Sequence, residues 1–502
     1  METLLRTPKL LPHPQNAVWG GGFLEWTKAE FQIDENGLPS GDFLSIVESP
    51  DVQSPEGYKL SITPNGIVVA VSHENGARRA LNTLQQIGMQ ADERGFRYCE
   101  ISDFPNVEIR VFSLNLSQGR IPTLEQLKLL VDRIALFKYN RLELRLTGAF
   151  PFEQHESLWA GKAVFPPSRI SRLKNYCAGL GIELTLAYDI SSGEISSGLL
   201  KQLTDNFDST EVNVICENIE KTDVFRCTEQ AVKAEINPTY IADCYVCDDF
   251  DVSALPLGTP IFSAKSGEQL ENVCKKLKSS GRKFYLRADM CLQKFSDYPQ
   301  ARNNIERAEE LLQKYGASGI VADFSLGEFT PLCSIYPQVV LLSSAMWSGC
   351  ATDEAVCEAL ESFVFYDNGG DFSRAVFALG NIIKSELLYD IFFADEKTLS
   401  EILSKNSDVD FDVLEGSADF AMGLCATSKA ECRDANIMSA EFALIGAMLK
   451  WSAQKSRCDQ AKETSQKLAL KFIIADFENI WLARNECGGL WEASAKLRAL
   501  LV

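Results

Sequence analysis

The alternation of apolar and polar residues over the first hundred positions predicts a small unit of strands and one helix. Residues 58–62 alternate, Pro64-Asn65-Gly66 is a turn signal, and residues 67–71 return as an apolar run, which together predict a β-hairpin. Residues 77–88 then follow a helical period. Strands followed by a helix favour an α+β domain.

The pattern changes at Ile109 to strands that alternate with helices. A helix begins after Thr123, which is spaced from Gln126 as in a capping box. Eight candidate strands follow, most of them separated by helices: 109–116, 142–146, 182–188, 212–216, 241–246, 260–264, 284–287 and 319–323. Their number and the length they occupy predict a closed (β/α)₈ TIM barrel, with an open doubly wound sheet as the alternative.

The last part of the chain carries only helical patterns. Apolar runs such as 442–451 and 468–482 have the spacing of buried helix faces. The sequence therefore predicts an α/β protein of three parts: a small α+β domain over residues 1–104, a (β/α)₈ barrel over 105–350, and a helical C-terminal region over 351–502.

Composition narrows the classes of partner. The 502 residues carry a formal net charge of −20, which disfavours binding to nucleic acid or to an anionic membrane. The first 22 residues lack the apolar run of a signal peptide, and no apolar stretch is long enough to span a membrane. We therefore expect a cytoplasmic protein with free thiols. With three His in all and no Gly-rich phosphate loop, neither a metal centre nor a cofactor is expected.

Polar residues at the carboxyl ends of the predicted strands are the candidates for chemistry, because barrel active sites lie there. Cleavage of a glycosidic bond generally needs two carboxyl groups. The alternative reading is that most of these groups are solvated loop charges. The candidates on or after the eight strands are Arg110, Asn115, Thr147, Asp189 to Glu194, Glu217, Asn218, Asp248, Asp249, Phe262, Asp289, Asp323 and Phe324.

Short motifs at residues 56–60, 76–86 and further along the chain together resemble glycoside hydrolase family 20, in its bacterial branch. Residues 56–60 and 76–86 resemble the non-catalytic domain that precedes the barrel in that family. The segments that are similar to its barrel and C-terminal part are Asp103-Phe104-Pro105, Arg120 to Thr123, Lys138 to Leu142, His155 to Trp159, Gly181 to Leu184, Tyr315 to Gly319, Trp481 to Asn485 and Gly488 to Leu490.

The resemblance implies β-N-acetylhexosaminidase chemistry. In that family the acetamide oxygen of the substrate is the nucleophile, an Asp holds the acetamide, and the adjacent Glu protonates the leaving oxygen. The matching segment here is Asn213 to Asn218, so Glu217 stands in place of the Asp and Asn218 in place of the acid. A carboxamide has no proton to give near neutral pH, and losing a positioned acid costs about 10²–10⁴-fold in rate.

Other positions of the family's sugar pocket also differ. Its Asp and Arg after the first strand correspond to Asn115 and Gln118, and its Trp walls to Phe262, Phe295 and Phe324. The resemblance implies substrate contacts for Arg110, Asp323 and these three Phe. The alternative for Arg110 is a surface ion pair, and the alternative for the Phe residues is core packing.

Three functions are left open. The first is a degenerate family member, a pseudoenzyme that binds a carbohydrate without standard hydrolysis. The second is an active β-N-acetylhexosaminidase that uses Glu217, Glu194 or Asp249 as a relocated acid. The third is an interaction protein whose barrel mouth is filled.

Overall fold

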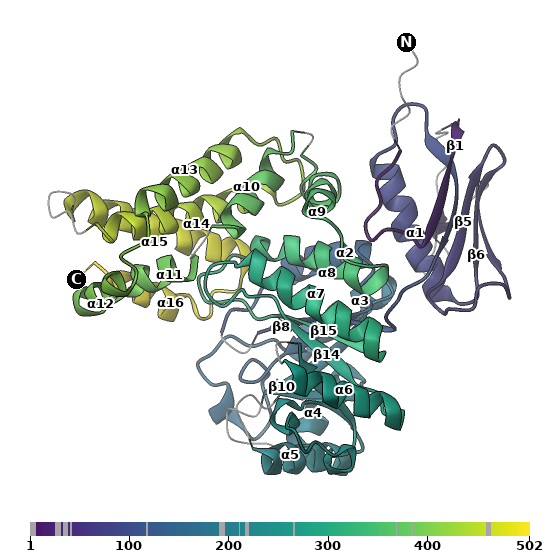
Figure 1. Cartoon of the computed structure of the whole chain (residues 1–502), viewed down its shortest axis with the longest axis horizontal. Helices are drawn as coiled ribbons and strands as arrows, with labels where there is room; N and C mark the ends of the chain where they lie inside the picture. The colour runs from purple at the N-terminus through teal and green to yellow at the C-terminus, as the bar shows by residue number, and fades with distance from the viewer. Residues whose placement is uncertain are drawn as a thin grey trace.

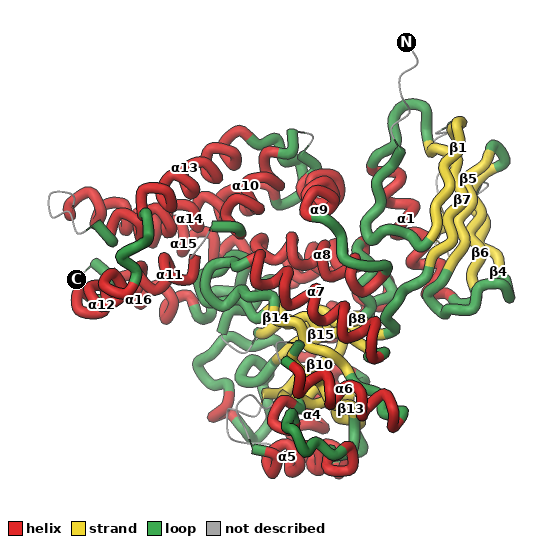
Figure 2. Tube along the Cα trace, viewed as in Figure 1, coloured by secondary structure: helices red, strands yellow, loops and turns green. Residues whose placement is uncertain are grey.

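The computed structural model describes residues 7–25, 32–33, 39–40, 43–116, 119–189, 196–209, 211–215, 220–264, 267–367, 369–382, 385–457 and 463–501. It has the three parts that the sequence predicts, and the small domain and the helical region both pack against the barrel (Figure 1). Figure 2 shows that the strands gather in the small domain and the barrel, whereas the C-terminal part is helical.

The small domain is a five-stranded sheet with one helix packed on it. The strand order is β1-β7-β5-β6-β4. The predicted hairpin is β5–β6, and Gly66 at its turn has φ +124°, a conformation that favours glycine. The elements are β1 (Asn16–Leu24), β4 (Leu44–Glu48), β5 (Tyr58–Thr63), β6 (Gly66–Val71), α1 (Glu74–Met89) and β7 (Phe96–Asp103), with a short pair β2 (Gln32–Ile33) and β3 (Pro39–Ser40).

Eight parallel strands close into a barrel, as predicted. Every neighbouring pair is parallel, and β15 pairs with β8 to complete the circle. The strands are β8 (Ile109–Asn115), β9 (Arg141–Arg145), β10 (Glu183–Asp189), β11 (Glu211–Ile215), β12 (Asn237–Ile241), β13 (Thr259–Ser263), β14 (Tyr285–Asp289) and β15 (Gly319–Phe324). The helices around them are α2 (Leu124–Leu136), α3 (Pro167–Gly179), α4 (Ser197–Phe207), α5 (Lys221–Lys233), α6 (Glu268–Ser280), α7 (Tyr298–Tyr315) and α8 (Tyr336–Trp347).

The fifth barrel strand differs from the prediction. It occupies Asn237–Ile241, and half of the predicted segment 241–246 is a short 3₁₀ turn, Asp243–Tyr245. Pro238 is tolerated within the strand, whereas in sequence the pair Asn237-Pro238 is typical of a turn. Helix α4, which the sequence reading did not include, has a regular N-cap at Ser196.

Residues after 350 form a layered helical region. Its elements are α9 (Asp353–Leu360), a π-helical turn η6 (Glu361–Phe365), α10 (Asp371–Gly380), α11 (Ser385–Phe393), α12 (Glu396–Lys405), α13 (Phe411–Thr427), α14 (Ala435–Lys455), α15 (Glu463–Arg484) and α16 (Leu490–Ala499). The longest of them, α14 and α15, contain the two apolar runs of the prediction.

A buried ionic cluster joins the helical region to the barrel. Arg484 at the end of α15 donates to Asp434 at 2.5 Å and also binds Glu441 and Gln126. Arg133 of the barrel helix α2 binds the same Asp434. Burial alone would raise the pKa of Asp434, but the two guanidiniums outweigh it and lower that pKa to about 2.

The chain after α15 also pairs with the start of α2. The Thr123 N–H donates to the Arg484 carbonyl at 3.0 Å, and the Glu486 N–H donates to the Ile121 carbonyl at 2.9 Å. Thr123 is the N-cap of α2, as predicted, but the Gln126 side chain accepts from Arg484 instead of closing the capping box.

Candidate functional site

Alternate residues of the barrel strands face inward and outward. The inward set forms a small apolar cluster of its own, separate from the core between strands and helices. Its buried members are Val111, Ala187, Ile215, Ile241, Ile261, Tyr285 and Val321. Polar residues occupy the remaining inward positions and make up the candidate site.

The first polar group inside the barrel centres on Glu143 of β9. Ser113 Oγ donates to its Oε1 at 2.6 Å, and Asn213 Nδ2 donates to its Oε2 at 3.1 Å. All three side chains are buried. Burial raises the pKa of Glu143, and the bonds from Ser113 and Asn213 offset only part of this rise. The barrel interior therefore holds a carboxyl group that is protonated more readily than usual.

The second polar group lies nearer the strand ends and centres on Asp323 of β15. Arg287 Nε donates to Asp323 Oδ2 at 3.0 Å, and Arg145 Nη2 lies 3.6 Å from the same oxygen. Ser325 Oγ donates to Oδ1 at 2.5 Å. Burial would raise the pKa of Asp323, but Arg287, Arg145 and Ser325 hold it well below its usual range. Asp323 is thus a fixed negative charge between two arginines.

Three further carboxylates surround the mouth of the barrel. Asp189 and Asp289 end their strands, and Asp243 follows β12. All three are half-buried. Backbone N–H groups donate to two of them: Ser263 to Asp243 at 2.7 Å and Cys291 to Asp289 at 2.8 Å. The mouth thus presents three partly exposed carboxylates, two of which are held by backbone N–H groups.

The residues predicted to be the departed catalytic pair lie outside the described residues. These residues are Glu217 and Asn218, and two other candidates, Gln118 and Glu194, are also outside the described residues. Their predicted roles stay predictions. Asp248 and Asp249 are exposed, in the loop before β13.

The predicted aromatic walls do not meet at the mouth. Asp323 and Phe324 are consecutive, so their side chains point to opposite faces of β15. Phe324 stacks on Phe112 with ring centroids 4.2 Å apart, in the core under the helices. Phe262 belongs to the same core, and Phe295 packs edge-on against Tyr389. These three Phe therefore pack the scaffold, which is the alternative that the sequence left open.

Arg110 lies at the other end of the barrel from Asp323. It is the second residue of β8 and faces outward, toward the small domain. Its Nη2 donates to Glu56 at 2.8 Å, its Nε to the Lys138 carbonyl at 2.9 Å, and its Nη1 to the Val107 carbonyl at 2.7 Å. The structure therefore places Arg110 in an ion pair between domains and not beside the candidate site.

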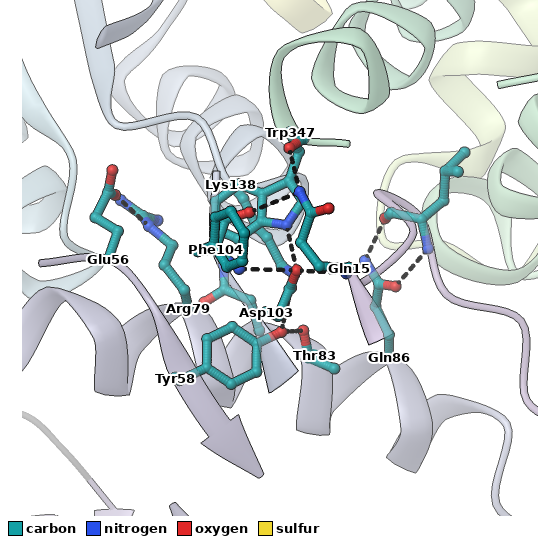
Figure 3. Close-up of polar contacts among 12 residues, drawn as sticks. Gln15, Glu56, Tyr58, Arg79, Thr83, Gln86, Asp103, Phe104, Lys138 and Trp347 are labelled. Carbon is teal, nitrogen blue, oxygen red and sulfur yellow. Dashed lines mark hydrogen bonds and ion pairs between the residues drawn. The ribbon is translucent and has the colours of Figure 1, made fainter. Parts of the chain in front are cut away.

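Figure 3 shows the polar interface to which Arg79, the second arginine bound to Glu56, belongs. Asp103 lies at its centre and accepts from Lys138, Tyr58 and Trp347 at 2.7 to 2.8 Å. Burial lowers the pKa of Lys138 despite its carboxylate partner. This interface holds the small domain against the barrel.

A cavity of about 330 Å³ lies beside the mouth, at the carboxyl ends of β8 and β15. Asn115, the last residue of β8, opens onto it. The C-terminal region closes its other side. Its lining is Leu114, Asn115, Leu116, Arg120, Pro122, Leu326, Glu328, Leu332, Asn485 and Lys496. We call it the rim pocket.

Sequence reasoning missed Glu143, Arg145 and Arg287 as site residues. The signal was present in the run Leu142-Glu143-Leu144-Arg145-Leu146, where two charges alternate with leucines in a buried strand. Charges at such positions have to face one another inside the barrel. Among the described residues no three His, Cys, Asp or Glu gather as a metal site would require, and no helix is long and apolar enough to cross a membrane.

Comparison with known proteins agrees with this architecture. The sequence model of "Glycosyl hydrolase family 20, domain 2" matches residues 8–104. The resemblance to glycoside hydrolase family 20 is confirmed. A β-hexosaminidase of Akkermansia muciniphila is 28% identical over 167 residues, which span 29% of this chain and 34% of that protein.

Solved structures with this fold include family 20 enzymes. The chitobiase of Flavobacterium johnsoniae aligns over 98% of this chain and 99% of its own, with a TM-score of 0.54 and 13% identity. An exo-β-N-acetylglucosaminidase from Vibrio harveyi in complex with N-acetylglucosamine aligns over 74% of this chain and 78% of its own, with a TM-score of 0.55 and 11% identity. At these identities the likeness establishes the fold.

Proposed function

We propose that the barrel mouth binds a carbohydrate of the N-acetylhexosamine type and that standard substrate-assisted hydrolysis is impaired or lost. The half-buried carboxylates Asp189, Asp243 and Asp289 around the strand ends carry the first part of the proposal, because carboxylates accept hydrogen bonds from sugar hydroxyls. The family 20 fold supports the class of sugar.

The proposed loss of hydrolysis rests on the residues that follow the fourth strand. Asn218 stands where family members have the acid, and Glu217 where they have the residue that holds the acetamide. Without an acid at that point the leaving oxygen departs unprotonated, at a cost of about 10²–10⁴-fold in rate. A cytoplasmic location is likewise a prediction from the sequence.

Binding is tested by calorimetric titration with N-acetylglucosamine and N-acetylgalactosamine. We expect one of them to bind and Asp289→Asn to weaken it, since the amide keeps an acceptor for the Cys291 N–H but loses the charge. Asp390→Asn, on an exposed ion pair with Lys294, is the matched control. Binding of neither sugar would exclude the proposal and favour the interaction-protein alternative.

An active hydrolase is the second candidate, and the several mouth carboxylates favour it because glycosidic cleavage needs two such groups. Release of the chromophore from an aryl N-acetyl-β-glucosaminide by the wild type, abolished by Glu217→Gln, would decide for it. With an inactive wild type, a gain of activity in Asn218→Glu would support our proposal, since only the acid would then be missing.

A further inference from the structure

Helix α15 is apolar on two opposite faces, and it lies on the side of the helical region away from the small domain (Figure 1). One face is buried in the core and consists of Leu470, Ile473, Ile474, Phe477 and Trp481. The opposite face also carries large apolar side chains, but Leu468 is 54% exposed, Phe472 64% and Leu482 54%. A surface helix normally has a polar outer face, so an apolar outer face is typical of a contact with another molecule.

The exposed side chains of α15 follow the spacing of a coiled coil. Leu468, Phe472, Ala475, Asn479 and Leu482 are separated alternately by four and three residues, and all five are exposed. This repeat of 3.5 residues places them on one narrow stripe along the 22-residue helix, at positions d, a, d, a and d of the heptad. We call these five residues the α15 stripe. A stripe of this kind fits the stripe of another helix.

The charges beside the α15 stripe fit a second copy of this chain in parallel orientation. Lys471 occupies a g position, and Asp476, five residues later, occupies an e position. In a parallel pair of helices a g residue of one faces the e residue five places later in the other, so a two-fold axis gives two Lys471–Asp476 ion pairs. Both side chains are exposed, and neither has an ion-pair partner within the part of the chain that the structure describes.

Asn479 favours the same orientation. It is the one polar residue of the α15 stripe and occupies an a position. In a parallel dimer an Asn at this position pairs with its own copy and fixes the register. In an antiparallel pair, a residues pack against d residues, and the three d residues here are Leu468, Ala475 and Leu482. Asn479 would then be buried without a polar partner, which is unfavourable.

We propose that α15 pairs with α15 of a second copy, in parallel orientation about a two-fold axis, so that the protein forms a homodimer. This inference is independent of the proposed sugar site. One pair of helices buries less than the roughly 1,600 Å² of a standard protein interface. We therefore expect a weak dimer, whose population depends on the protein concentration.

Sedimentation velocity of the full chain over a series of concentrations tests the homodimer. We expect the wild type to change from monomer to dimer between about 1 and 100 μM, and Phe472→Asp to stay monomeric. Phe420→Asp is the matched control, because Phe420 on α13 is 64% exposed, like Phe472. A wild type that stays monomeric throughout this range would overturn the proposal. A dimer that persists in Phe472→Asp, or that only Phe420→Asp removes, would do the same.

An exchange of charges tests the parallel orientation. Lys471→Glu should weaken the dimer by about tenfold, because two attractive pairs become repulsive. The double variant Lys471→Glu with Asp476→Lys should restore the wild-type affinity, since the pairs are formed again with their charges exchanged. Both positions are exposed, so the melting temperatures should match that of the wild type. A double variant that associates no better than Lys471→Glu would overturn the parallel pairing.

Discussion

Trp347 Nε1 donates to Asp103 Oδ1 at 2.8 Å, and this bond joins the last barrel helix to the last strand of the small domain. The same carboxylate accepts from Lys138 Nζ at 2.8 Å through its other oxygen. Both partners are buried. The interface therefore depends on the ion pair between Asp103 of the small domain and Lys138 of the barrel.

Replacing Asp103 by Asn should destabilise the protein strongly. Lys138 would keep its buried ammonium without a carboxylate, which costs about 3–5 kcal/mol. Urea denaturation measures the change, with Asp390→Asn as a control expected to stay within about 1 kcal/mol. A loss for Asp103→Asn no larger than that of the control would contradict the role given to this interface.

Glu56 should make the protein sensitive to acid. Burial would raise its pKa, but Arg110 and Arg79 lower it from 4.5 to about 2. As the pH falls, the Glu56 carboxylate is protonated in the unfolded chain at a higher pH than in the folded protein. The stability that Glu56 supplies is therefore present above about pH 4.5 and is lost as the pH falls towards 2. Glu56→Gln should lower the melting temperature at pH 7 and flatten the acid side of the stability profile. A profile parallel to that of the wild type would refute this.

Glu143 should have the opposite effect on stability. Burial raises its pKa above the ordinary 4.5, so the folded protein holds the proton more tightly than the unfolded chain. Its contribution is complete below pH 4.5 and declines as the pH rises through the folded pKa. The melting temperature of Glu143→Gln relative to the wild type should therefore rise between pH 4.5 and 8. A difference independent of pH would show that Glu143 titrates normally.

Phe262 provides a test of the outward-facing aromatics. Phe262→Ala should cost about 3–5 kcal/mol, because the ring is fully buried among core residues. The ring packs in the core and not at the barrel mouth. The affinity of the folded variant for N-acetylhexosamine, measured below its melting temperature, should therefore stay within about twofold of that of the wild type. A large loss of affinity in a folded variant would return Phe262 to the sugar site.

Much of the fold could be predicted from the sequence because strand and helix periods are local signals. The eight-stranded barrel, the hairpin at Gly66 and the N-cap at Thr123 all follow from them. The fifth strand was predicted too late in the chain, because Asn237-Pro238 has the composition of a turn while the ladder to β13 needs no N–H from Pro238.

The candidate site was harder to predict because facing directions depend on register. Asp323 and Phe324 are neighbours in sequence, yet one faces the barrel axis and the other the helices. Arg110 has the residue type of a sugar ligand, but its distance from the end of β8 places it at the small domain. A strict count of alternate residues along each strand would have separated these cases.

The buried ion pairs between the barrel and its flanking parts have a consequence for the choice of fragments to express. Carboxylates that neutralise Arg110, Lys138 and Arg133 come from Glu56, Asp103 and Asp434, all contributed by the flanking parts. A fragment limited to residues 105–350 would leave these three cations without their carboxylate partners and would expose apolar surface that the flanking parts cover. Expression trials should therefore keep the flanks attached and vary only what lies inside the barrel.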